Sequence, residues 1–259
     1  MSDAAPPVLL AVDGAVASLV LNRPRQGNSL SAGLVAALCA ALEALASRED
    51  VKVIVISGAG GRIFSAGHDL TEFTGNPGED ALREDFAGLV GLMQQIMAQP
   101  QIVIAKVEGV ATAAGCELVA ACDLALASDA ARFAAPGVNI GFWCHTPQVL
   151  LERGVGRKHA MMMLATGSLF PAEHALRIGL VNAVHPVCEL DAAVDALAST
   201  IASKPASVLR AGKRSFHHQS RMPVREAYAF VQGEALRNIV HPDAIEGITA
   251  FLEKRSPEW

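Results

Sequence analysis

The sequence of 259 residues is poor in aromatic side chains and contains a single tyrosine. Aromatic residues make up 5% of the chain, whereas 51% of its residues are hydrophobic. A folded core must therefore be packed mainly from Ala, Val, Leu and Ile. The sequence also lacks the run of roughly 18–20 apolar residues that a membrane-spanning helix needs. We therefore expect no membrane insertion.

Cysteine is scarce as well, and the five cysteines are odd in number and scattered along the chain. This pattern disfavours a disulfide framework or a zinc site and indicates free thiols in a reducing compartment. The first residues, Met1–Pro7, contain neither a basic nor an apolar segment, so no secretory signal is visible. We therefore expect a cytoplasmic protein.

Strong charge and several catalytic motifs are also missing. The net charge is −5, with acidic and basic residues interspersed, so we expect no nucleic-acid partner. The histidines lack the His-Glu-x-x-His spacing of a metal site, and no Gly-x-Ser-x-Gly elbow of a serine hydrolase is present. The glycine-rich loop Ser57–Gly61 does not continue into the Gly-Lys-Ser/Thr of a phosphate-binding loop. We expect neither a metal nor a nucleotide of that type.

Apolar runs and helical spacings predict an α/β fold. Asp13-Gly14 separates two strand-like runs and predicts a hairpin. The runs Val51–Ser57 and Ile102–Val107 are typical of strands buried on both faces. From Thr146 onward the pattern is mainly helical, over 146–153, 158–165, 171–178, 189–202, 206–219, 224–239 and 242–253. We therefore predict a core of ββα repeats over residues 1–195 and a helical C-terminal region over 196–259.

Two clusters of small residues follow the buried strands, Phe64–Leu70 and Ala111–Asp123. Ala and Gly gather where another group must approach the backbone closely. The second cluster continues into a helical pattern, so its amides lie at a helix N-terminus, which attracts negative charge. If the two turns converge, they provide two N–H donors for an oxyanion. This pattern predicts an enzyme.

Glu117 is the first candidate catalytic residue, because it lies in the first turn of that helix among apolar side chains. It either complements the helix dipole or serves as an acid or base. Burial would raise its pKa and the helix end would lower it, so the sequence leaves the value open. The His68 side chain either faces solvent or reaches a bound acyl group, and Asp123 is expected to cap the helix or form a pair.

The two clusters resemble the oxyanion-hole motifs of the crotonase (enoyl-CoA hydratase/isomerase) superfamily. Further landmarks match along essentially the whole chain, namely Leu21–Arg25, Ala165–Gly167, Ala175–Val181 and Glu246–Arg255. The resemblance implies a crotonase-like spiral of ββα repeats that assembles as a homotrimer or homohexamer. It also implies an acyl-CoA substrate, a place in fatty acid and lipid metabolism, and no cofactor beyond the coenzyme A of the substrate.

By this resemblance, the backbone N–H groups of His68 and Ala114 bind the thioester oxygen, while Glu117 manages water and protons. The family usually has Gly at the Ala114 position. Ala keeps the N–H donor, but its methyl group narrows the approach. The positions that match the coenzyme A site are Arg25, Ala66, His68, Asp69, Leu70, Thr71, Ala114, Phe251 and Lys254.

The sequence departs from the family at Gly137, where well-characterised hydratases carry a second catalytic glutamate. Three functions therefore stay open. The first is enoyl-CoA hydratase, with Glu117 as the acid–base residue. The second is decarboxylation of a malonyl-type acyl-CoA, with His68 orienting the carboxylate. The third is an acyl-CoA-binding protein with little turnover, because Gly137 replaces the glutamate.

Overall fold

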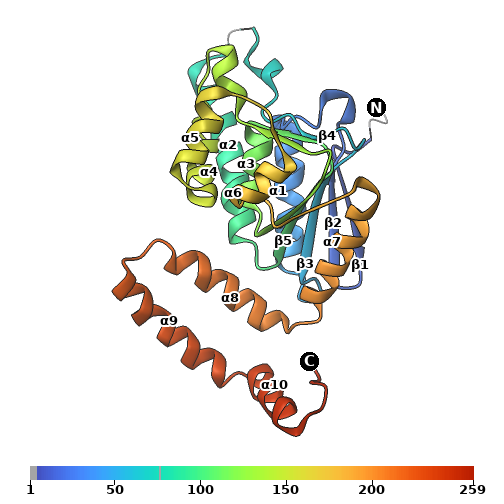
Figure 1. The fold of residues 1–259 in the computed structure, drawn as a ribbon, viewed down its shortest axis with the longest axis vertical. Coiled ribbons are helices and arrows are strands. Elements are labelled where there is room, and N and C mark those ends of the chain that lie inside the picture. Colours follow the sequence, from blue (N-terminus) through green and yellow to red (C-terminus); the bar gives the residue numbers. More distant parts are fainter. Residues whose placement is uncertain (1–4, 76) are drawn as a thin grey trace.

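The computed structural model describes residues 5–75 and 77–259. Within these residues the centre of the molecule is a six-stranded sheet (Figure 1). Its strand order is β1 (Val8–Asp13), β2 (Val16–Leu21), β3 (Val53–Gly58), β5 (Ile102–Val107), β7 (Leu124–Ser128) and β10 (Ala183–His185). β1 and β2 form the predicted antiparallel hairpin around Asp13-Gly14, and the other neighbours are parallel.

A second, smaller sheet positions the site. Its order is β4 (Ile63–Ser65), β6 (Val110–Thr112), β8 (Arg132–Ala134) and β9 (Phe170–Pro171). β4, β6 and β8 each follow one strand of the large sheet and pair in parallel with each other. The sequence pattern predicted no strand at β4 or β6, because three residues are too few to show an alternation of apolar and polar positions. The spiral of ββα repeats is nevertheless the observed fold.

Helices cover both faces of the large sheet (Figure 1). One face packs against α1 (Ala32–Ala46). α2 (Glu79–Ala98) packs in turn against α1 and against α3 (Ala114–Ala121). The opposite face packs against α7 (Val187–Ala202). Ser31 caps α1 by accepting a hydrogen bond from the Leu34 N–H. The remaining helical elements of this part are η1 (Pro24–Gln26), η2 (Leu70–Phe73), η3 (Pro136–Ile140), α4 (Pro147–Val155), α5 (Arg157–Thr166) and α6 (Ala172–Ile178).

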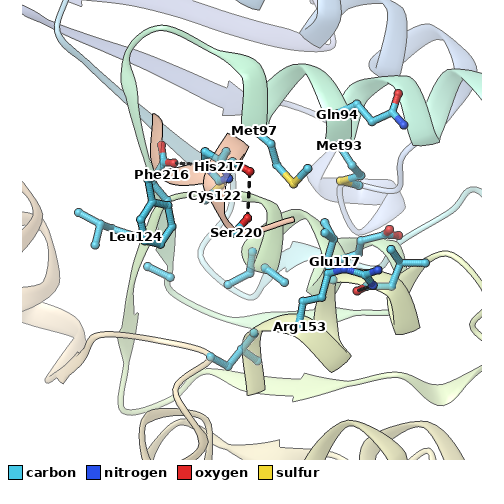
Figure 2. Close-up of a pocket in the computed structure, with 18 of the residues that line it drawn as sticks. Met93, Gln94, Met97, Glu117, Cys122, Leu124, Arg153, Phe216, His217 and Ser220 are labelled. Atoms are coloured by element: carbon cyan, nitrogen blue, oxygen red, sulfur yellow. Dashed lines mark hydrogen bonds and ion pairs between the residues drawn. The ribbon is translucent and has the colours of Figure 1, made fainter. Parts of the chain in front are cut away.

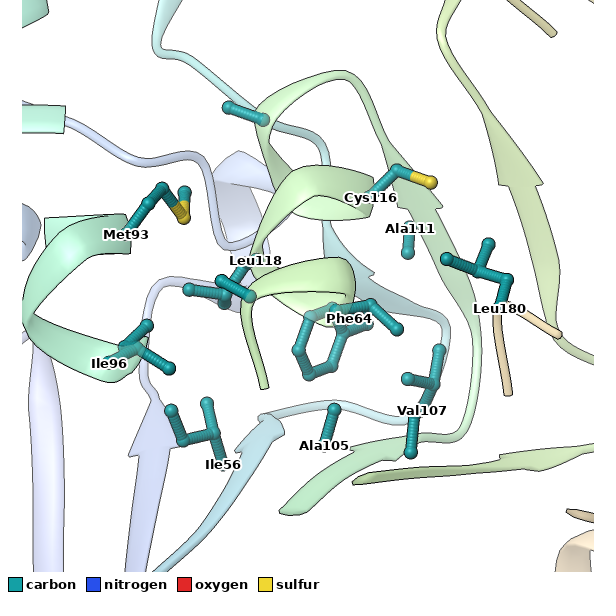
Figure 3. Close-up of a cluster of buried hydrophobic side chains, with 14 of the residues drawn as sticks. Ile56, Phe64, Met93, Ile96, Ala105, Val107, Ala111, Cys116, Leu118 and Leu180 are labelled. Carbon is teal, nitrogen blue, oxygen red and sulfur yellow. The ribbon is translucent and has the colours of Figure 1, made fainter. Parts of the chain in front are cut away.

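The core contains mostly aliphatic side chains, as the composition predicts. Figure 3 shows Phe64 below α3, surrounded by Ala105, Val107 and Leu118. A separate apolar cluster joins the other face of the sheet to α7. α3 therefore lies on a tightly packed base, which fixes the position of its N-terminus.

Three helices at the end of the chain form a C-terminal arm, residues 206–253, which extends away from the two sheets (Figure 1). They are α8 (Ala206–Gln219), α9 (Val224–Ile239) and α10 (Pro242–Glu253), at the positions that the sequence predicts. The predicted division after residue 195 falls within α7, and two separate domains stay a prediction. Among the described helices, none combines the length and the apolar character needed to cross a bilayer.

Candidate active site

The two clusters of small residues meet because β4 and β6 are neighbours. Gly67 has a φ of +89°, and a Cβ atom there would lie 2.7 Å from the Thr112 carbonyl oxygen and 2.9 Å from the Ala114 nitrogen. A Cβ atom at Gly115 would lie 2.3 Å from the Ser65 carbonyl oxygen. Side chains at these positions would push the two backbones apart, so the small residues make the close approach possible.

His68 and Ala114 line the same small cavity, which has a volume of about 250 Å³. Their backbone N–H groups donate no hydrogen bond to any group in residues 5–75 and 77–259. Neighbouring amides are paired, since Asp69 donates to Leu30 and Ala113 donates to Ala134. Ala114 is also the first residue of α3, so the helix dipole adds to the attraction for an anion.

Ala113 has an unusual backbone conformation, with a φ of +50° and a ψ of −122°. Residues with a Cβ atom rarely adopt such angles, and the strain costs on the order of 1–3 kcal/mol. This conformation lets the Ala113 N–H pair with β8 while the following amide stays free. Sequence reasoning missed the strain, because an alanine carries no signal of a left-handed backbone.

Glu117 lies one turn into α3 and is only 3% exposed. Burial raises its pKa to about 7 from an ordinary value of 4.5, and the Thr146 hydroxyl beside it offsets part of this rise. Its Oε2 atom has no hydrogen-bond partner among the described residues. Figure 2 shows Glu117 with Met93 and Met97 around a second, larger cavity of about 1140 Å³. The carboxyl group is therefore a buried acid that can change its protonation near neutral pH.

The two cavities share two lining residues, His145 and Thr146, in the segment before α4. His68 and Ala114 line the small cavity, and Glu117 lines the large one. The two cavities therefore adjoin at this segment. Nothing in the sequence marked His145, since it lies in no recognised motif.

Gly137, in η3, has no room for a side chain. A Cβ atom there would lie 2.3 Å from the Phe142 carbonyl oxygen and 2.9 Å from Cys144 Sγ. The Gly137 N–H donates a hydrogen bond to Cys144 Sγ at 3.3 Å. The space of a glutamate side chain is thus filled by the chain itself, and not merely left empty.

The His68 imidazole does not face solvent, which corrects one of the two expectations for it. Its side chain is 11% exposed and lies edge-on against Phe73 and Phe86, with ring centroids at 4.6 and 5.3 Å. Its Nε2 atom is 2.5 Å from Asp85 Oδ2 on α2. The side chain is held in place, and with it the turn that carries the His68 backbone N–H.

Asp69, the residue after His68, helps to fix the backbone turn that contains both residues. Burial would raise the pKa of this carboxyl group, but hydrogen bonds from Thr71, Arg23 and Ser29 outweigh burial and lower the pKa to about 2. Arg23 Nη1 lies 2.9 Å from Asp69 Oδ2, and the Ser29 hydroxyl lies 3.0 Å from the same oxygen. Asp69 is therefore ionised, and the protein itself provides its partners.

The other residues that match a coenzyme A site are spread out. Ala66 and Leu70 line the small cavity, whereas Arg25 is an exposed residue of η1. Phe251 lies in the last turn of α10 and Lys254 directly after that helix, and both are absent from the described lining of the two cavities. A coenzyme A role for these five residues stays a prediction.

Asp123 has structural partners on α8. The predicted pairing of Asp123 is present, because its carboxylate lies 2.6 Å from Lys213 Nζ and 3.2 Å from His217 Nε2 on α8.

His68, Glu72 and Asp85 offer ligand atoms within 4.8 Å of each other. Glu72 accepts hydrogen bonds from the Ala32 N–H, and His68 pairs with Asp85. The expectation that the protein holds no metal stays a prediction.

Known proteins resemble this chain along almost its whole length. The sequence model of the enoyl-CoA hydratase/isomerase family matches residues 11–259. Rat mitochondrial enoyl-CoA hydratase domain-containing protein 3 is 43% identical, over 94% of this chain and 81% of its own length. The crystal structure of the human protein of that name has a TM-score of 0.95 and 42% identity, over 98% of this chain and 100% of its own. A crystallised enoyl-CoA hydratase from Mycobacterium smegmatis has a TM-score of 0.96 and 44% identity, over 98% of this chain and 99% of its own.

These names correct one expectation. The rat, mouse, human, frog and zebrafish relatives are all named as mitochondrial proteins. The cytoplasmic location expected from the sequence is therefore wrong. Free thiols indicate a reducing compartment, but they do not distinguish one such compartment from another.

Proposed function

The chain belongs to the enoyl-CoA hydratase/isomerase family, and we propose that it adds water to a 2-enoyl-CoA thioester. One observation carries this proposal. Two unpaired amides, of His68 and Ala114, meet at one cavity, and the buried acid Glu117 lies one helical turn away. The proposal includes coenzyme A only as part of the substrate.

The amides stabilise charge that develops during the reaction. As water adds to the β-carbon of the substrate, the double-bond electrons move toward the thioester carbonyl and form an enolate. The two N–H groups donate to the enolate oxygen, and the loss of one such donor costs on the order of 3 kcal/mol. The close backbone contact at Gly67 and the packing of the His68 ring hold this pair before substrate binds.

Glu117 manages a proton at the adjacent carbons. With a pKa of about 7, its carboxyl group can both hold and release a proton at neutral pH. This match between pKa and working pH favours general acid–base catalysis. The unpartnered Oε2 atom is the group that would contact the substrate.

The other functions differ in their support. Decarboxylation of a malonyl-type acyl-CoA needs the His68 imidazole for the substrate carboxylate, but that ring is already paired with Asp85. An acyl-CoA-binding protein with little turnover is the second candidate. The observation that favours it is the closed space at Gly137, which holds no second carboxylate.

A second copy of the chain is part of the proposal. The C-terminal arm exposes large apolar side chains, including Tyr228 at 72%, Leu236 at 65% and Phe251 at 81%. Such a surface is typical of a protein–protein interface. We infer a homotrimer or homohexamer, in which Phe251 and Lys254 reach a coenzyme A site, and a mitochondrial location as in the named relatives.

Steady-state hydration of crotonyl-CoA by the wild type and Glu117→Gln tests the function. The variant keeps the shape of the side chain but holds no exchangeable acid, so we expect kcat to fall by about 100-fold or more. Equal rates in the two proteins would exclude Glu117 as the catalyst. Micromolar binding of acyl-CoA without turnover of any enoyl-CoA would instead support the binding protein.

A further inference from the structure

The proposed hydration needs two proton transfers, one from water and one to the α-carbon. Glu117 is one buried carboxyl group, and the closed space at Gly137 leaves no site for a second. The second proton transfer therefore needs another side chain, one that borders both the oxyanion donors and Glu117. Of the described residues, only His145 and Thr146 line both cavities, and of these two only His145 has a side chain with a basic nitrogen that can accept a proton.

His145 occupies a defined position at this junction. Its backbone N–H donates to the Trp143 carbonyl at 2.8 Å, and α4 begins two residues later. Its ring lies edge-on to Phe142, with the centroids 5.9 Å apart. Phe142 in turn stacks with Phe86, whose ring contacts His68. The imidazole is thus placed beside the cavity that holds the amide donors, and it is also exposed to solvent.

The other titratable or charged side chains of the two cavities have different partners or properties. His68 is paired with Asp85, and both Lys213 and His217 are paired with Asp123. Arg153 donates to the Val149 carbonyl, and arginine keeps its proton in proteins. The remaining groups that face the cavities are Glu117, Cys122, Cys144 and Arg221. Burial raises the pKa of both thiols, which makes them poor proton carriers.

We propose that His145 is the second acid–base catalytic residue and accepts the proton of the attacking water. This inference rests on the proposed hydration. The water oxygen bonds to the β-carbon while His145 takes one of its protons, and the double-bond electrons form the enolate. Glu117 then gives its proton to the α-carbon, and the carbonyl re-forms. The net reaction adds one water molecule across the double bond. The proton that His145 accepted returns to Glu117 through solvent.

The exposure of the two groups fits this division of roles. His145 is exposed, so it can meet water and exchange protons with it, whereas Glu117 is 3% exposed and faces the interior. In these roles His145 must start without a proton and Glu117 must start with one, so the rate should fall toward both ends of the pH range. A bell-shaped profile of kcat/KM is the expected signature.

The test compares His145→Gln with wild type in two reactions of the full-length protein. In hydration of crotonyl-CoA, we expect kcat to fall by about 100-fold and the rise on the acid side of the profile to disappear. In exchange of the α-protons of butyryl-CoA with deuterium oxide, which needs only Glu117 and the amides, we expect a rate within about threefold of wild type. Retained exchange also shows that the variant is folded.

Controls separate this inference from the proposed function. His159→Gln removes an exposed histidine of α5 outside both cavities and should leave both reactions unchanged. If His145→Gln keeps wild-type hydration and both limbs of the profile while Glu117→Gln is inactive, the role of His145 is refuted and the function stands. If the wild type hydrates no enoyl-CoA, both fail. Loss of exchange together with hydration would also refute the role, because it would show general damage to the site.

Discussion

Replacing Glu117 by Gln should stabilise the protein, and the gain should depend on pH. The raised pKa, from 4.5 to about 7, means that the folded state binds this proton more tightly than the unfolded state. Between these two values the unfolded chain has lost the proton and the folded protein keeps it, so stability falls as pH rises. Above pH 7 the free energy of unfolding of the wild type is lowered by about 3 kcal/mol at most through this effect. Glutamine has nearly the shape of the protonated acid and carries no such penalty.

Urea unfolding of both proteins from pH 4 to pH 8.5 measures this effect. At pH 4 the free energies of unfolding should be nearly equal. At pH 8.5 Glu117→Gln should be more stable than wild type by about 2–3 kcal/mol. The matched control is Glu43→Gln, which makes the same change at an exposed carboxylate on α1 and should give no comparable gain in stability at pH 8.5.

A difference between Glu117→Gln and wild type that stays constant from pH 4 to pH 8.5 would refute the reasoning. It would mean that the carboxyl group is solvated in the folded state. The acid–base role in the proposed function would then lose its physical basis, because that role depends on a pKa near the working pH.

Two further predictions concern the backbone of the site. Gly137→Ala should lower the free energy of unfolding by about 1–3 kcal/mol, because its Cβ atom would meet the Phe142 carbonyl oxygen and Cys144 Sγ. Urea unfolding measures this, and a neutral result would show that the segment yields easily and that a glutamate could be restored there. Ala113→Gly should raise the free energy of unfolding by about 1 kcal/mol, because glycine adopts a positive φ without strain. A thermal melt that shows a loss of stability would contradict the strain at Ala113.

Much of the fold followed from local patterns. The hairpin around Asp13-Gly14 and the strand Ile102–Val107 appear where the sequence predicts them, and so do the helices of the C-terminal arm. Strands of six residues and helices of twelve or more carry enough periodicity to be recognised. The short strands β4 and β6 do not, and these are the elements that bring the two clusters of small residues together.

By itself, the sequence determined where close backbone contact is needed, because Gly67 and Gly115 have no side chain to prevent it. It also placed Glu117 in the first turn of α3. Only the tertiary structure decided that this carboxyl group is buried and that its pKa is raised, since its burial depends on the residues of α2 and α4 that pack around α3. The same holds for the strained φ of Ala113, the filled space at Gly137 and the position of His145 between two cavities. These properties arise from segments far apart in the chain, and no local pattern of residues records them.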